Sequence, residues 1–334
     1  MPDFTTVGDY ARQLVQRRQN AEVRARMDTL LSETGSGRKA DLSGALRGDF
    51  TRLAAFEREL SDLSAFDTSA AELRGRADAA QLALAAVQAD SRDLAGDLIG
   101  APTGQPLGLD VLAEDARGRF AAAVSALNTE VAGRSVFAGV ATDGPALAAA
   151  ADMLTAVEGV IAAEPDAASA EAALRAWFAP GGGFDTAGYV GATTPIPDQP
   201  VAPGIRLGTR VTAEDAALRD VLASLALAAL SGRGPLGADG DSQREALRSA
   251  GLSLSDAQTG LSELRGSLGV VEARLEEVTA RNAAERTALE TSRATLAEVD
   301  IYETATELEG VQSQLELLYA VTARSARLNL VSAL

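Results

Sequence analysis

The strongest pattern in the sequence is an alternation of three- and four-residue steps between apolar positions. It is most regular over residues 247–278, after which polar Asn282 and Glu285 take the next two positions. Such spacing over many turns predicts one long helix with a narrow apolar seam. The two polar residues are expected either to fix register against partner helices or to face solvent where the bundle thins. The seam positions are Leu247, Ala250, Leu254, Ala257, Leu261, Leu264, Leu268, Val271, Leu275 and Val278.

The same spacing recurs in the first half of the chain and predicts further long helices. Shorter runs occupy residues 42–64 and 109–132. These helices and the long one are expected to form a bundle. The longest of the early runs consists of Leu73, Ala77, Ala80, Leu84, Val87, Ser91, Leu94 and Leu98.

Each end of the chain carries a thin seam of its own. The phase shifts by two residues after Val299, so Asp300 is expected to separate a bundle helix from a terminal helix. At the other end, Gly35 and Gly37 are expected to end the first helix. Because each seam is too narrow to bury itself, we expect the two ends to pair and other copies of the chain to cover what remains. The N-terminal seam positions are Phe4, Val7, Ala11, Leu14, Val23, Met27 and Leu30.

Residues 141–237 differ from the rest of the chain. Their pattern predicts one helix that ends before Pro165, one that ends near Trp177, and a third over 213–231. Glycine and proline are concentrated between the second and third helices, a composition typical of turns and short strands. The segment therefore predicts a small inserted α+β domain. Its strand-like runs are 187–192 and 204–211.

The predicted fold class is mainly α, a long coiled-coil and helical bundle built from both chain ends with a small inserted α+β domain. The sequence predicts three parts. Residues 1–36 with 300–334 are the terminal coiled-coil helices, 37–140 with 238–299 are the bundle, and 141–237 are the outer insertion.

Composition narrows the function classes. The net charge is −17 and the only lysine is Lys39, with acidic and basic groups interspersed, so no cationic surface for nucleic acid is expected. The chain lacks cysteine and histidine, which removes disulfides, thiolate nucleophiles and the commonest acid–base group. No stretch approaches the roughly 18 to 20 apolar residues of a membrane span, so membrane insertion is not expected. The N-terminal residues also lack the pattern of a cleaved signal peptide.

Three segments resemble chemical motifs but fit structural roles better. The glycine-rich residues 180–191 lack the Gly-Lys-Ser/Thr ending of a phosphate loop and predict a flexible connector. Asp239 and Asp241 have calcium-like spacing without a ligand at the loop's end, and Ser242 is expected to begin a capping box for the long helix. The carboxylates from Asp300 to Glu309 have the spacing of a helix's polar face. The sequence therefore predicts no enzyme activity, no catalytic residues, no metal and no cofactor.

Two segments resemble a known family. The C-terminal "EVDIYETATELEGVQSQLELLYAVTARSARLNLVSAL" (298–334) resembles the end of bacterial flagellins and their hook-associated relatives. "LNTEVAGRSVFAG" (127–139) is similar to the "N...GRYLFAG" segment of the hook-filament junction members of that family. The segment after Gly37 departs from the family, because it lacks the usual acidic pair and proline.

The resemblance implies a structural component of the bacterial flagellum that joins the hook to the filament. It implies self-assembly into a ring, contacts with a neighbouring hook-associated protein and flagellin, an export chaperone, and an extracellular location reached without a cleaved signal peptide. A filament-forming flagellin and a type III secretion tip or scaffold protein are the alternatives. The expected assembly interface consists of Phe4, Val7, Leu14, Met27, Leu30, Ile301, Leu308, Val311, Leu315, Leu318, Val321, Leu328, Leu330 and Leu334.

Overall fold

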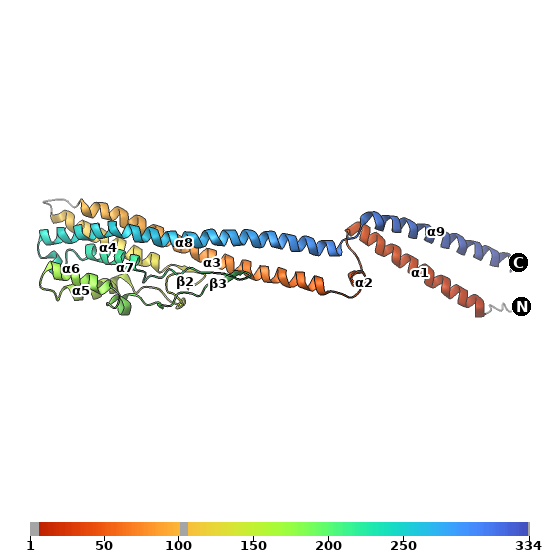
Figure 1. Ribbon diagram of the computed structural model, residues 1–334, viewed down its shortest axis with the longest axis horizontal. Helices are drawn as coiled ribbons and strands as arrows, with labels where there is room; N and C mark the ends of the chain where they lie inside the picture. The colour runs from red at the N-terminus through yellow and green to blue at the C-terminus, as the bar shows by residue number, and fades with distance from the viewer. Residues whose placement is uncertain (1–6, 101–105, 333–334) are drawn as a thin grey trace. The chain divides into compact units, whose positions relative to one another are not determined.

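The chain folds into two compact units. One comprises Met1–Asp62 with Ala284–Leu334, and the other Leu63–Ala283. The computed structural model describes residues 7–100 and 106–332 (Figure 1). Side chains at 7–9, 12–13, 106–107 and 325–332 lie outside the description. No helix within the described residues is long and apolar enough to cross a membrane.

The unit Leu63–Ala283 is built on parts of two long helices, α3 and α8. Every predicted seam residue from Leu73 to Leu98 on α3 is buried, with an exposed fraction of 2% or less. On α8, eight of the ten seam positions are buried and Leu264 and Val271 are half-buried. The heptad prediction is confirmed here because side chains three and four residues apart share one face of a helix. The long helices are α3 (Thr51–Ile99), α4 (Pro106–Leu127) and α8 (Gly240–Ala297).

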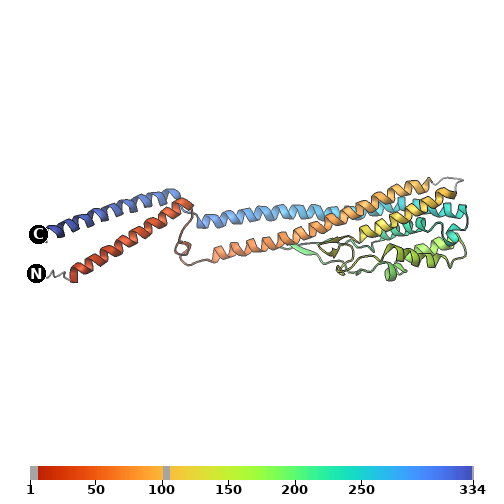
Figure 2. The same cartoon turned by 180° about the vertical axis from the view of Figure 1, so that it is seen from behind.

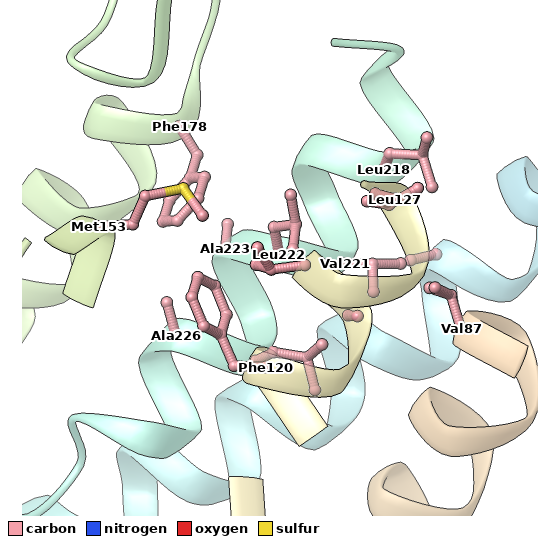
Figure 3. Packing of buried hydrophobic residues seen from close by; sticks show 14 of the residues in the cluster. Val87, Phe120, Leu127, Met153, Phe178, Leu218, Val221, Leu222, Ala223 and Ala226 are labelled. Carbon is pink, nitrogen blue, oxygen red and sulfur yellow. The ribbon is translucent and has the colours of Figure 1, made fainter. Parts of the chain in front are cut away.

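Three shorter helices complete the core of this unit. The predicted helices of the middle segment are present as α5 (Ala150–Ile161), α6 (Ala167–Phe178) and α7 (Ala216–Ala229). Figure 3 shows Phe120 and Leu127 of α4 beside Val221, Leu222 and Ala226 of α7. Met153 of α5 and Phe178 of α6 belong to the same cluster.

The core therefore does not separate residues 141–237 from the bundle. One hydrophobic cluster includes residues of α3, α4, α5, α6, α7 and α8. The two compact units divide the chain differently from the three predicted parts, because amphipathic helices α5 to α7 bury their apolar faces against α4 and its neighbours.

Apart from two isolated bridges, the β-structure in the described residues consists of two small hairpins. Hairpin β1–β2 pairs Glu130–Val131 with Arg134–Ser135, and hairpin β3–β4 pairs Gln199–Ala202 with Ile205–Leu207. The predicted strand at 204–211 overlaps β4, whereas 187–192 contains only an isolated bridge between Tyr189 and Leu147.

Hairpin β3–β4 is hydrogen-bonded to α8 through Asn282, the polar residue predicted at a seam position. Asn282 is 1% exposed, and its Nδ2 donates a hydrogen bond of 2.9 Å to the Val201 carbonyl. Val201 packs with Leu275 and Val278 in a small second cluster. Asn282 thus contacts its own chain, rather than facing solvent.

The glycine-rich segment at 180–191 is packed and not a free connector. It forms a π-helical turn, Phe184–Gly188 (η1), with Phe184 fully buried. The Asp185 carboxylate accepts a hydrogen bond from Gly181 N at 2.6 Å and pairs with Arg219 at 2.5 Å. Arg219 is 7% exposed and lies 4.8 Å from the centre of the Phe184 ring. The backbone N–H of Gly181 and the guanidinium hold the pKa of Asp185 below its usual value.

The other unit contains the two terminal helices, α1 (Val7–Ser36) and α9 (Ile301–Ser332), and the short α2 (Leu42–Ala45). Helices α1 and α9 lie side by side and antiparallel, so the C-terminal end of α1 is next to the N-terminal end of α9 (Figures 1 and 2). Helix α1 ends before Gly37, whose φ of +68° favours glycine. Helix α9 begins after Asp300, whose Oδ1 accepts hydrogen bonds from Tyr302 N and Glu303 N. Both predicted breaks are confirmed.

Candidate assembly interface

The seam between α1 and α9 is narrow. On α1 the inward positions advance by four and three residues, and only Leu30 among them is fully buried, at 5% exposed. On α9 Thr304 and Val311 are each 6% exposed and their neighbours in the seam are half-buried. The inward positions are Gln16, Asn20, Val23, Met27, Leu30 and Thr34 on α1, and Thr304, Leu308, Val311, Leu315 and Leu318 on α9.

Two polar contacts flank this seam. The Tyr319 hydroxyl accepts hydrogen bonds from the Arg24 guanidinium at 2.7 and 3.1 Å, and the guanidinium also lies 5.6 Å from the ring centre. Arg26 pairs with Glu307 across the two helices. These side chains are exposed, so each contact contributes no more than about 1 kcal/mol.

One seam position contains an unsatisfied polar atom. The Oδ1 atom of Asn20 is buried and has no hydrogen-bond donor among the described residues. A buried acceptor without a donor costs about 1–3 kcal/mol. The seam between α1 and α9 therefore contains one buried acceptor, Asn20 Oδ1, that destabilises the pair.

Leu14, a predicted seam and interface residue, lies outside the seam between α1 and α9. This side chain is 62% exposed, whereas Val23, Met27 and Leu30 face α9. Leu14 and Val23 are nine residues apart, two more than a heptad, so a single straight stripe on the helix cannot contain both.

The remaining predicted interface residues fall into three groups. Met27, Leu30, Leu308, Val311, Leu315 and Leu318 lie in the seam between the chain's own helices. Ile301 and Val321 are exposed, at 60% and 54%. Phe4 and Leu334 lie outside the described residues, as do the side chains of Val7, Leu328 and Leu330.

The structure adds exposed apolar residues that the heptad pattern does not include. Leu317, at 65% exposed, lies four residues before Val321, so both occupy one helix face beside the seam. Val321 was among the predicted interface residues, and a search for i, i+4 apolar pairs next to the main stripe would have added Leu317. Among the described side chains of the two helices, the large apolar ones that are exposed are Tyr10, Leu14, Val15, Leu31, Ile301, Tyr302, Leu317, Tyr319 and Val321. We call these nine residues the terminal apolar surface.

The residues that follow α1 pair through their backbones with the residues at the C-terminal end of α8. Arg38 and Glu298 form an antiparallel bridge, flanked by hydrogen bonds from Lys39 N to Ala297 O at 2.8 Å and from Val299 N to Gly37 O at 3.1 Å. The Lys39 ammonium also donates to Leu296 O at 3.2 Å.

The predicted chemical motifs have capping and ion-pair roles. Helix α8 begins at Gly240, and Asp239 Oδ1 accepts hydrogen bonds from Asp241 N and Ser242 N, so Asp239 and not Ser242 caps the helix. These bonds hold the pKa of Asp239 below its usual value. Across the described parts of the chain, His, Cys, Asp and Glu side chains form no group of three that could hold a metal.

Comparison with known proteins agrees with this architecture. Residues 253–334 match the family model of the bacterial flagellin C-terminal helical region. That segment resembles flagellin. It contains α9 and much of α8, and it indicates a structural, non-enzymatic protein with a flagellar, extracellular location.

A solved structure shares the fold. It is from Vibrio parahaemolyticus and was assigned as a flagellar hook-associated protein. It is 15% identical, with a TM-score of 0.52, and the match covers 75% of this chain and 99% of that one. At this identity the similarity concerns the fold, and it confirms the mainly α prediction. Among curated protein sequences none matches the chain.

Proposed function

We propose that this chain is a structural subunit of the bacterial flagellum that joins the hook to the filament and assembles into a ring through its terminal helices. The observation that carries the proposal is the terminal apolar surface, because five of its nine residues lie on α9, within the segment that matches flagellin. The proposed partners are further copies of this chain, a neighbouring hook-associated protein, flagellin and an export chaperone.

The energetics of the α1–α9 pair support assembly. Burying a leucine or valine side chain contributes about 1.5–3 kcal/mol, but most of the described apolar side chains of these helices remain partly or largely exposed. Neighbouring subunits that cover the terminal apolar surface would gain this burial.

The choice of the junction role rests on two weaker similarities. Residues 127–139 are similar to a segment of junction members, and the fold is similar to a protein assigned as hook-associated. The matched family model describes flagellins in general, so a filament-forming flagellin is the second candidate.

Deletion of the gene separates these roles when cells and medium are examined together. Bare hooks with unpolymerised flagellin in the medium are the expected result for a junction protein. Hooks that lack filaments, with no flagellin in the medium, would identify this chain as the filament subunit. Motile cells with normal filaments would contradict both roles.

A further inference from the structure

The seam between α1 and α9 specifies its own register weakly. A shift of α9 by one heptad would place Leu315 where Leu308 lies and Leu318 where Val311 lies, so these two positions would stay apolar, while Thr322 would take the place of Leu315. The flanking pairs of Arg24 and Arg26 are exposed and add little. Something else must select one register.

The junction provides backbone contacts that a shifted register could not make. The hydrogen bonds from Lys39 N and Val299 N connect positions about 260 residues apart in sequence. They flank the Arg38–Glu298 pair in the pattern of a non-hydrogen-bonded antiparallel pair, in which the two Cα atoms lie about 4.5 Å apart. Both helices leave this bridge directly, α1 ending at Ser36 and α9 beginning at Ile301.

Lys39 supplies two of the donors at this bridge. The last carbonyls of a helix have no partner within the helix, and the helix dipole makes that end negative. The backbone amide of Lys39 donates to Ala297 O, and its ammonium donates to Leu296 O. The only lysine of the chain therefore closes the C-terminal end of α8. Ala40 N, which donates to the Glu33 carboxylate at 2.8 Å, ties the same segment back to α1.

We propose that residues 37–40 and 296–300 form a register clamp, with Lys39 as its positioning residue, that fixes how α1 pairs with α9. The clamp determines which side chains remain in the terminal apolar surface. Its importance for assembly rests on the proposed function, whereas its effect on register can be measured on the isolated chain.

Engineered disulfides test the register directly, because the chain has no cysteine of its own. The pair Arg38→Cys with Glu298→Cys lies within disulfide reach, since its Cα spacing suits the bond. The pair Arg38→Cys with Ala305→Cys, which lies on α9 seven residues after Glu298, reports a shifted register. We expect the first pair to crosslink within the monomer at least about tenfold faster than the second under mild oxidation. Similar rates for both pairs would overturn the clamp.

The role of Lys39 is tested in the same background. Lys39→Met keeps the backbone amide and removes the ammonium, and Lys39→Arg restores a cation. Amide hydrogen exchange at Val299 is expected to rise roughly two- to fivefold in Lys39→Met, the range given by a cation at a helix C-terminus, and to recover in Lys39→Arg. Crosslinking of the shifted pair should rise with it. If Lys39→Met changes neither reading, Lys39 is not the positioning residue.

Assembly is measured last, with the oxidised Arg38→Cys/Glu298→Cys protein and its reduced form as the control. We expect both to assemble equally, because the clamp holds the register used in the assembly. Loss of assembly on oxidation alone would overturn this part of the proposal. Failure of both forms and of the unmodified chain would instead count against the proposed function.

Discussion

At the scale of single residues, the Asp185 carboxylate, which accepts a hydrogen bond from Gly181 N and pairs with Arg219, links stability to pH. The folded pKa of Asp185 is lowered, so the unfolded chain binds a proton more readily than the folded one. The pair therefore contributes stability above the ordinary aspartate pKa and loses it as pH falls through the folded value. Arg219 is buried and would lose its carboxylate partner in Asp185→Asn.

We expect Asp185→Asn to lower the free energy of unfolding at pH 7 by about 1–2 kcal/mol. Below pH 4 the free energy of unfolding should fall less steeply in the variant than in the parent chain, because the variant has no carboxylate to protonate at this position. Denaturant unfolding at several pH values measures this. Asp198→Asn is the matched control, because its partner Arg210 is 74% exposed and the pair should contribute less than about 1 kcal/mol. An unchanged acid response in Asp185→Asn would refute the assignment.

At the scale of elements, a substitution on the exposed face of α9 should impair assembly without affecting folding. Leu317 is 65% exposed, so Leu317→Asp should alter the unfolding free energy by no more than about 0.5 kcal/mol. The same carboxylate would have to lose its water in a subunit interface, and we therefore expect polymerisation to fail. Light scattering or electron microscopy of assembly mixtures measures the outcome.

Leu82→Asp provides the control for this variant. Leu82 is 73% exposed on α3, in the other compact unit, and its replacement should leave assembly through the terminal helices intact. If Leu317→Asp assembles as well as Leu82→Asp, the terminal apolar surface is not the interface.

Elements with an uninterrupted heptad could be predicted from the sequence, and elements set by distant contacts could not. The α3 seam from Leu73 to Leu98 is buried as predicted, because a repeat of this length allows only one buried face. Strand β3 escaped prediction because Pro200 lies within it and Pro203 follows it, and proline normally argues against a strand. Its partner Asn282 lies 81 residues from Val201, a contact that no local pattern contains.

The candidate interface, too, could be predicted only as far as local spacing determines it. The seam on α9 from Leu308 to Leu318 follows from its spacing, but spacing alone does not distinguish a face that packs on α1 from one left for neighbours. The phase error at Leu14 has the same origin, because two short apolar runs on one helix were joined into one stripe.

At the scale of the whole molecule, residues 141–237 stabilise the unit that contains them. Phe120 and Leu127 of α4 share a core with α5, α6 and α7, so these three helices are part of the structural framework. The terminal helices have little core of their own. One unit is well packed and the pair of terminal helices is sparsely packed. This difference agrees with the proposal that the subunit folds first and that its terminal helices become fully packed on assembly.

The most direct test of the proposed role is the position of the protein on intact flagella, measured by immunogold electron microscopy with antibodies against the unit Leu63–Ala283. We expect gold confined to a short zone where the hook meets the filament. Labelling along the whole filament, or none on the flagellum, would contradict it.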